Sequence, residues 1–157
     1  MNAPDIHIAC AANIGYVPHV ATLLQSIAAT HTSGEVPVHF LHDEGVGADD
    51  LQLLRHSAEK AGLRFHSYLP STQQLEQLPV SVRYPQVVWF RVLLPDLLPD
   101  VERVLYLDAD TLVLQDLSSL WRLNLDDLPL AAVEDALSPA HAHVPIEIGL
   151  VRREDYF

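Results

Sequence analysis

Two aspartates, Asp108 and Asp110, directly follow an apolar run from Val104 to Leu107. The run predicts a buried β-strand, and residues i and i+2 of a strand face the same side. We therefore expect both carboxylates to point together into the crevice where regular strand pairing ends. Two hard oxygen ligands there suit Mg²⁺ or Mn²⁺, and such ions keep open positions for the phosphates of a ligand. The pattern predicts a divalent metal site for a phosphorylated molecule.

This Asp-x-Asp triplet has two other interpretations. Many such triplets are solvated turns or helix caps, but exposed charges without a ligand are less expected at the inner end of a central apolar strand. Haloacid-dehalogenase-like phosphatases also place Asp-x-Asp after a strand, with the first Asp as nucleophile and the second as acid/base. Their pattern resembles Asp-x-Asp-Gly-Thr on the first strand, whereas here Thr111 and Leu112 follow the pair, and the pair begins at position 108. The phosphatase is kept as a remote alternative.

The elements that must position these carboxylates alternate in type along the chain. The expected strands are Ile6 to Ala11, Val36 to His42, Arg64 to Tyr68 and Val104 to Leu107, with a weaker one at Leu130 to Val133. The expected helices are Val17 to Ile27, Asp49 to Ala61 and Val87 to Leu94, the last stopped by Pro95. Such alternation predicts an α/β fold with an open, mostly parallel sheet that binds ligands at the carboxyl ends of its strands. Asn13 and Asp108 both fall at such ends.

Composition limits the classes of function. The chain has 157 residues, of which 49% are hydrophobic and 19% charged, so one globular domain with a sizeable core is expected. The formal charge of −12 disfavours nucleic-acid binding. No apolar run is long enough to span a bilayer, the start lacks a secretory signal, and Cys10 has no partner for a disulfide. A cytoplasmic protein is therefore expected, with Cys10 as a small buried hydrophobe.

Two blocks resemble glycosyltransferase family eight, the retaining galactosyltransferase and glycogenin-like enzymes. The first block is Ile8 to Val17, which is similar to the opening strand and the uridine-contacting loop of that family. The second and more specific block runs from Trp89 to Pro99 and from Arg103 to Val113. The resemblance extends from Ile6 to Phe157 and covers the amino-terminal half of the family.

The resemblance implies a GT-A fold, typical of nucleotide-diphospho-sugar transferases. It also implies transfer of a hexosyl group from a UDP-sugar to a glycan or lipopolysaccharide acceptor, with retention of the anomeric configuration. Asp108 and Asp110 match the pair that binds Mn²⁺ or Mg²⁺, and Ala109 matches a backbone contact to the ribose. Arg91 matches an arginine that helps to bind the donor sugar. No residue of this chain is assigned as a catalytic nucleophile or base.

Ala11, Asn13 and Tyr16 match loop positions around the uracil and the ribose. Asn13 stands where some relatives have Asp, and its amide can pair with the uracil edge. Tyr16 could stack on the base, or it could be an ordinary helix-start aromatic packed on the core. Gly15 replaces a commonly larger polar residue. For Arg91, the alternative is an ordinary surface salt bridge.

The carboxyl-terminal part carries the last expectations. Arg152 to Phe157 resembles the approach to the Asn-Ala/Ser-Gly strand of the family, so we expect residues 1–157 to form a single but incomplete GT-A domain without the distal histidine ligand and the acceptor side. His141 and His143, beside prolines, are expected in a surface loop from Ser138 to Pro145 rather than as replacement ligands. The chain is then either an enzyme or a UDP-sugar and metal-binding remnant. Expected partners are a complementing carboxyl-terminal fragment or a second copy, and contact with the inner face of the membrane.

Overall fold

The structure, a computed structural model, describes residues 5–31, 34–76, 78, 80–81, 85–126 and 128–133. The chain divides into two compact units, residues 1–122 and 123–157. Every helix and strand found among the described residues lies in the first unit. The expectation of a single domain over residues 1–157 stays a prediction.

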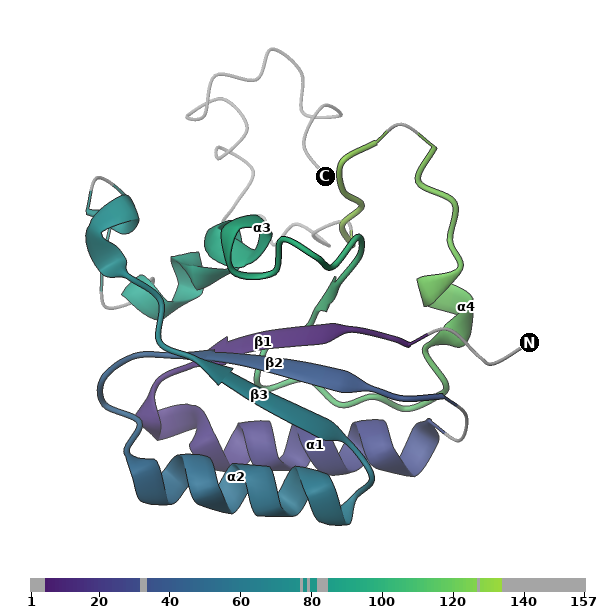
Figure 1. The fold of residues 1–157 in the computed structure, drawn as a ribbon, viewed down its shortest axis with the longest axis horizontal. Coiled ribbons are helices and arrows are strands. Elements are labelled where there is room, and N and C mark those ends of the chain that lie inside the picture. Colours follow the sequence, from purple (N-terminus) through teal and green to yellow (C-terminus); the bar gives the residue numbers. More distant parts are fainter. Residues whose placement is uncertain are drawn as a thin grey trace, which may run out of the picture. The chain divides into compact units, whose positions relative to one another are not determined.

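A four-stranded parallel sheet forms the centre of the first unit (Figure 1). Its strands are β1 (Ile8–Ala12), β2 (Pro37–His42), β3 (Arg64–Tyr68) and β4 (Leu105–Tyr106), in the order β3-β2-β1-β4. β1 pairs with β2 from Ile8 opposite Val38 to Ala12 opposite His42, and it pairs with β4 at Ala9 opposite Tyr106. The predicted α/β fold with a parallel sheet is confirmed.

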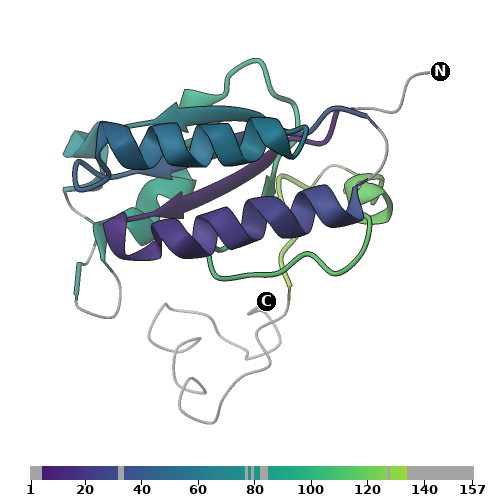
Figure 2. The same ribbon diagram turned by 90° about the horizontal axis from the view of Figure 1, so that it is seen from below.

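Helices cover both faces of this sheet. On one face, α1 (Val17–Thr30) and α2 (Ala48–Lys60) lie side by side (Figure 2), and on the other lie the 3-10 helix η3 (Gln86–Leu93) and α3 (Leu94–Leu97). The shorter helices are η1 (Ile14–Tyr16), η2 (Thr72–Leu75) and α4 (Ser118–Trp121).

Alternate side chains of β1 enter two separate cores, because Ile8 and Cys10 pack toward α1 and α2 whereas Ala9 packs toward η3. Burial raises the pKa of the Cys10 thiol to about 12, as suits its predicted place in the core.

Local sequence explains where the two long helices begin and end. Pro18 occupies the first turn of α1, where its missing N–H is not needed. At the start of α2, the Asp50 carboxylate accepts a hydrogen bond of 3.2 Å from the Gly47 N–H. The end of α2 is followed by Gly62 at φ +77°, a conformation that glycine adopts without strain. The predicted helix end at Gly62 is therefore confirmed.

Two predictions near the site need correction. Pro95 does not stop a helix, since η3 continues directly into α3 with Pro95 in the first turn of α3. The predicted strand Val104 to Leu107 is reduced to Leu105–Tyr106, which is only half-buried and lies at an edge of the sheet formed by the described residues. The N–H groups of Leu105 and Leu107 donate backbone hydrogen bonds of 2.9 Å to the carbonyls of His7, just before β1, and of Ala9 in β1.

In the second unit, the predicted strand Leu130 to Val133 is wrong. Its four residues form no strand, and the side chain of Val133 is 94% exposed, so the segment lacks both a pairing partner and a buried face. Before it, the side chains of Asn124 and Asp126 close a local turn. The predictions on Ser138 to Pro145 (with His141 and His143) and on Arg152 to Phe157 fall outside the described residues. None of the described helices is long and apolar enough to cross a membrane.

Candidate functional site

A hollow of about 330 Å³ lies at the carboxyl ends of β1 and β4. The chain leaves β1 for α1 on one face of the sheet, whereas it reaches β4 from η3 and α3 on the other face. The order of strands therefore reverses beside β1, and in open parallel sheets such a switch point opens the crevice that binds ligands. The described residues that line the hollow are Ala11, Ala12, Asn13, Tyr16, Pro85, Val87, Val88, Arg91, Tyr106, Asp108, Ala109 and Asp110.

Asp108 and Asp110 both line this hollow, but not through strand alternation. The chain turns at Ala109, where the Thr111 N–H and hydroxyl both donate to the Asp108 carbonyl, at 3.1 and 2.7 Å. Ala109 is 5% exposed and packs into the core, so the turn is anchored between two exposed carboxylates. Both aspartates line the same hollow, and a turn instead of an extended strand brings them there.

Arg91 of η3 contacts the first aspartate of the pair, Asp108. Its Nη2 donates to Asp108 Oδ1 at 2.9 Å, and its Nε donates to the Val88 carbonyl at 3.0 Å. The guanidinium carbon lies 4.4 Å from the centre of the Tyr106 ring. Burial raises the pKa of Tyr106 to about 12, so the ring stays neutral at any ordinary pH.

The β1 side of the hollow is built by a small turn. The Gly15 N–H donates to Asn13 Oδ1 at 3.0 Å, which fixes the Asn13 amide at the start of η1. A Cβ at Gly15 would stand 3.3 Å from that oxygen, so the small residue relieves crowding. Tyr16 is 44% exposed with its ring 5.0 Å from the His19 ring, and the interpretation of Tyr16 as a core aromatic is wrong.

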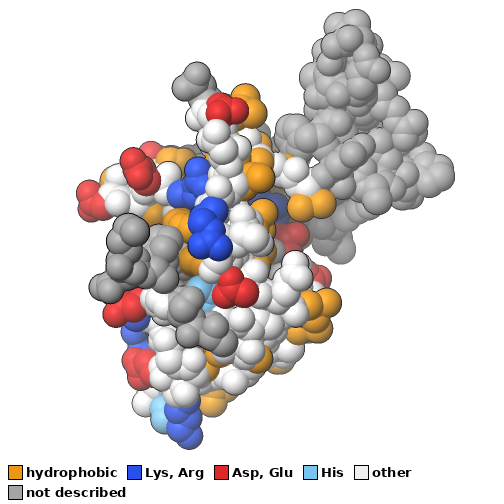
Figure 3. All heavy atoms as spheres, turned by 90° about the vertical axis from the view of Figure 1, so that its right-hand side faces the viewer, with side chains coloured by type: hydrophobic (Ala, Val, Ile, Leu, Met, Phe, Trp, Pro, Cys, Tyr) orange, Lys and Arg blue, Asp and Glu red, His pale blue; other side chains and the backbone are white. Residues whose placement is uncertain are grey.

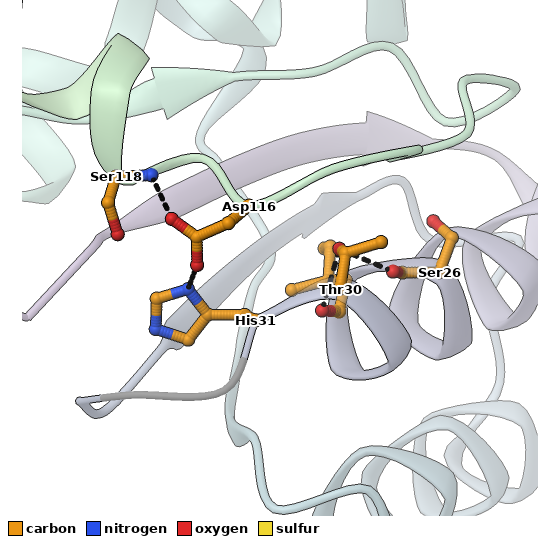
Figure 4. A network of polar contacts seen from close by, with 6 residues as sticks. Ser26, Thr30, His31, Asp116 and Ser118 are labelled. Carbon is orange, nitrogen blue, oxygen red and sulfur yellow. Dashed lines mark hydrogen bonds and ion pairs between the residues drawn. The ribbon is translucent and has the colours of Figure 1, made fainter.

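The segment after Asp110 is tied to α1 by polar contacts. Ser26 of α1 accepts a 3.0 Å hydrogen bond from the Val113 N–H, three residues after Asp110. Further along, Asp116 lies between His31 Nδ1, at 3.2 Å, and the Ser118 N–H, at 2.8 Å (Figure 4). Hydrogen bonds from Ser118 hold the pKa of Asp116 below its usual range. These contacts fix where the chain leaves the hollow after the turn at Ala109.

The residues of the hollow fit a hard divalent cation as a partial ligand set. Asp108 and Asp110 supply carboxylate oxygens, which Mg²⁺ and Mn²⁺ prefer. Within the described part of the chain, no three His, Cys, Asp or Glu side chains gather as a metal site. A cation held by two carboxylates would keep coordination positions for water and for ligand phosphates.

All of the predicted site residues therefore line one hollow: Ala11, Asn13, Tyr16, Arg91, Asp108, Ala109 and Asp110. Sequence reasoning missed Tyr106 and the apolar wall of Pro85, Val87 and Val88. Tyr106 could have been found, because it precedes Asp108 by two residues and so faces the same side of the strand. Pro85 carried no such signal, since its place depends on how η3 packs on the sheet.

The other end of the sheet, at the amino ends of the strands, carries many charged side chains. Acidic and basic side chains stand next to one another there (Figure 3). A hollow of about 360 Å³ on this side is lined by Asp5, His7, Asp100, Val101, Glu102, Arg103 and Trp121. None of the predicted site residues belongs to it.

Solved structures show the class of fold. Galactosyltransferase LgtC, in complex with donor and acceptor sugar analogues, superposes with a TM-score of 0.77 at 24% identity over 93% of this chain and 52% of LgtC. A structure of an active-site mutant of LgtC gives a TM-score of 0.68 at 27% identity over 83% of this chain and 46% of that chain. The fold is therefore the GT-A type of glycosyltransferases, as predicted.

Sequence comparison gives the family. Residues 7–157 match Glycosyl transferase family 8, and the chain belongs to that family. Relatives include General stress protein A of Bacillus subtilis, 29% identical over 83% of this chain and 46% of that protein, and the lipopolysaccharide 1,2-glucosyltransferase of Escherichia coli, 28% identical over 83% and 38%. The chain spans about half the length of these relatives or less. Membership in this family disfavours the phosphatase alternative.

Proposed function

We propose that this chain is the donor-binding part of a retaining glycosyltransferase that transfers a hexosyl group from a UDP-sugar to a glycan or lipopolysaccharide acceptor. The observation that carries the proposal is the hollow at the carboxyl ends of β1 and β4. The two sequence blocks that resemble the family both contribute residues to its lining. The similarity to the lipopolysaccharide 1,2-glucosyltransferase of Escherichia coli supports the class of acceptor.

Charge explains why a cation is needed. The described lining carries one guanidinium, Arg91, against two carboxylates, Asp108 and Asp110, so its formal charge is −1. A diphosphate would be repelled by that sign, whereas a divalent cation on the two carboxylates makes the lining +1. When bound, Mn²⁺ or Mg²⁺ supplies positive charge that stabilises the UDP group as it departs.

The remaining residues account for the rest of the donor. The Asn13 oxygen is held by the Gly15 N–H, which leaves the Asn13 amide N–H groups for a uracil carbonyl. The exposed Tyr16 ring offers a face for the base, and the turn backbone at Ala109 and the strand end at Ala11 bound the ribose. Arg91 contacts the donor sugar.

The first test is thermal unfolding with UDP and MnCl₂. Because a ligand at 100 times its Kd stabilises the folded state by about 2.7 kcal/mol, the melting temperature of the wild-type chain should rise by several degrees. Asp108→Asn and Asp110→Asn should abolish the rise. Asp96→Asn, an exposed aspartate of α3 outside this hollow, serves as the matched control and should retain it. A rise that survives both site substitutions would refute the assignment of the pair.

A second measurement separates enzyme from binding remnant. Release of UDP from UDP-glucose or UDP-galactose, with and without a saccharide acceptor, reports transfer or donor hydrolysis. A chain that binds UDP but releases none from either donor is the remnant. Retention of the anomeric configuration and the cytoplasmic location stay predictions.

A further inference from the structure

Arg91 is held at three points by its protein neighbours. Its Nε donates to the Val88 carbonyl within η3, its Nη2 donates to Asp108 Oδ1, and its guanidinium carbon lies over the Tyr106 ring. The ion pair itself is exposed, with side-chain exposures of 42% for Arg91 and 58% for Asp108. Exposed pairs contribute little stability, so the ordering of Arg91 needs a further cause.

The Tyr106 ring supplies a fixed surface for that guanidinium. Tyr106 belongs to β4, is half-buried, and packs against the core formed with η3. Tyr106 pairs with Ala9 of β1 across the sheet, so the residue that carries the ring is held by β1 as well as by β4. An arginine over a tyrosine face is attracted by the electrons of the ring, and its flat guanidinium suits this stacking better than an ammonium group.

We propose that Tyr106 is a positioning residue that acts through Arg91, a role that rests on the proposed function. By holding the guanidinium against its ring, it makes Arg91 fix the Asp108 carboxylate through one oxygen, which would leave the other oxygen for a divalent cation. The contact of Arg91 with the Asp108 carboxylate uses Oδ1, so Oδ2 is the oxygen that would hold the cation.

The same arrangement prepares Arg91 for the donor. Two of the five N–H groups of the side chain are used by Val88 and Asp108, so three remain for oxygen atoms of the UDP-sugar. A side chain that is already ordered loses less conformational entropy when the ligand binds. Loss of the ring should therefore weaken nucleotide affinity without changing which atoms bind.

A double-mutant cycle tests whether Tyr106 affects UDP binding through Arg91. The affinity for UDP in saturating MnCl₂ is measured by calorimetry in wild type, Tyr106→Leu, Arg91→Gln and the double variant. Removal of the ring should weaken UDP binding about three- to tenfold when Arg91 is present, and less than twofold in the Arg91→Gln background. Tyr106→Phe keeps the aromatic face and should stay within about twofold of wild type.

Equal losses from Tyr106→Leu in both backgrounds would overturn the proposal, because a merely structural role acts regardless of Arg91. If wild type itself fails to bind UDP, the proposed function fails, and this inference fails with it. Binding by wild type together with no coupling between the two residues refutes this inference alone.

Arg91→Lys gives a variant that does not disturb the interior, since Arg91 is exposed. Lysine keeps the charge but loses the flat stacking surface and the Nε bond to Val88. The expected result is a loss of UDP affinity of the same size as in Tyr106→Leu. Wild-type affinity in Arg91→Lys would mean that charge alone suffices, and it would overturn the role of the ring.

Discussion

His39 of β2 is a buried titratable residue away from the candidate site. Its Nε2 lies 3.0 Å from His7 Nδ1, and its Nδ1 lies 3.0 Å from the Tyr68 hydroxyl. The His66 ring stacks on it at 5.4 Å. Burial, with smaller contributions from His7, His66 and Arg64, lowers the pKa of His39 to about 4 from 6.5. The folded protein therefore holds this imidazole neutral where an unfolded chain would protonate it.

We expect this residue to make the stability fall in mild acid. Since the folded pKa lies below the unfolded one, the contribution is complete above pH 6.5 and is lost as the pH falls toward 4. Between pH 7 and pH 5 the free energy of unfolding should drop by roughly 2 kcal/mol from this group. Urea unfolding of wild type and His39→Gln at both pH values measures it. Parallel losses in the two proteins would contradict the assignment.

Residue identities at the site could be predicted from the sequence, but their neighbours could not. The Asp108 and Asp110 pair is visible because a strand end and a short spacing are local features. The ion pair between Arg91 and Asp108 joins two segments that are 17 residues apart, and only the packing of η3 on the sheet decides it. Asp110 also reaches the hollow through the turn at Ala109, which no alternation rule predicts.

At the scale of elements, the turn that carries Asp110 depends on α1. Ser26 Oγ donates to the Leu23 carbonyl at 2.8 Å within the helix and accepts the Val113 N–H from the neighbouring segment. Thr22 lies on the same helix, and among the described residues its hydroxyl bonds within the helix alone, to the Pro18 carbonyl at 3.0 Å. The two hydroxyls therefore differ in one contact, the hydrogen bond that Ser26 accepts from Val113 in the segment after Asp110.

Ser26→Ala should lower the free energy of unfolding by about 1–2 kcal/mol, because the part-buried Val113 N–H loses its acceptor. It should also weaken UDP binding in the presence of Mn²⁺, because the segment that follows the turn at Ala109 is no longer fixed. Thr22→Ala, the matched control, should change stability by less than about 0.5 kcal/mol. Denaturant unfolding and calorimetry check both values. Equal behaviour of the two variants would show that the contact to Val113 does not anchor the turn.

The sequence predicted elements well where periodicity and end signals agree. The helix that begins at Val17 and the end of α2 before Gly62 are both local in origin. Pro95 was misleading, because the same residue that breaks a helix interior is favourable in a first turn. The length of β4 was overestimated, since pairing with β1 ends where the chain turns toward Asp108.

In the first unit as a whole, the sheet separates two hydrophobic layers, which should affect stability and nucleotide binding differently. Phe40 is fully buried in the layer toward α1 and α2, and Phe90 is 1% exposed in the layer toward η3 and α3. Val87, which lines the hollow, belongs to the second layer, and so does Phe90, which precedes Arg91 in η3. Substitutions in either layer should therefore lower the free energy of unfolding. Substitutions in the layer that contains η3 should weaken nucleotide binding more than those in the other layer.

Phe40→Leu and Phe90→Leu separate these contributions. Each substitution leaves unfilled space in a buried cluster and should lower the free energy of unfolding on the order of 1–2 kcal/mol. Phe90 precedes Arg91 in η3, so its replacement lets the helix shift on the sheet and should weaken UDP binding severalfold in MnCl₂. Phe40→Leu should leave that affinity close to wild type at a temperature where both variants are folded. Equal affinities in the two variants would mean that η3 keeps its position without Phe90, and that the β1 and β4 ends alone determine the donor site.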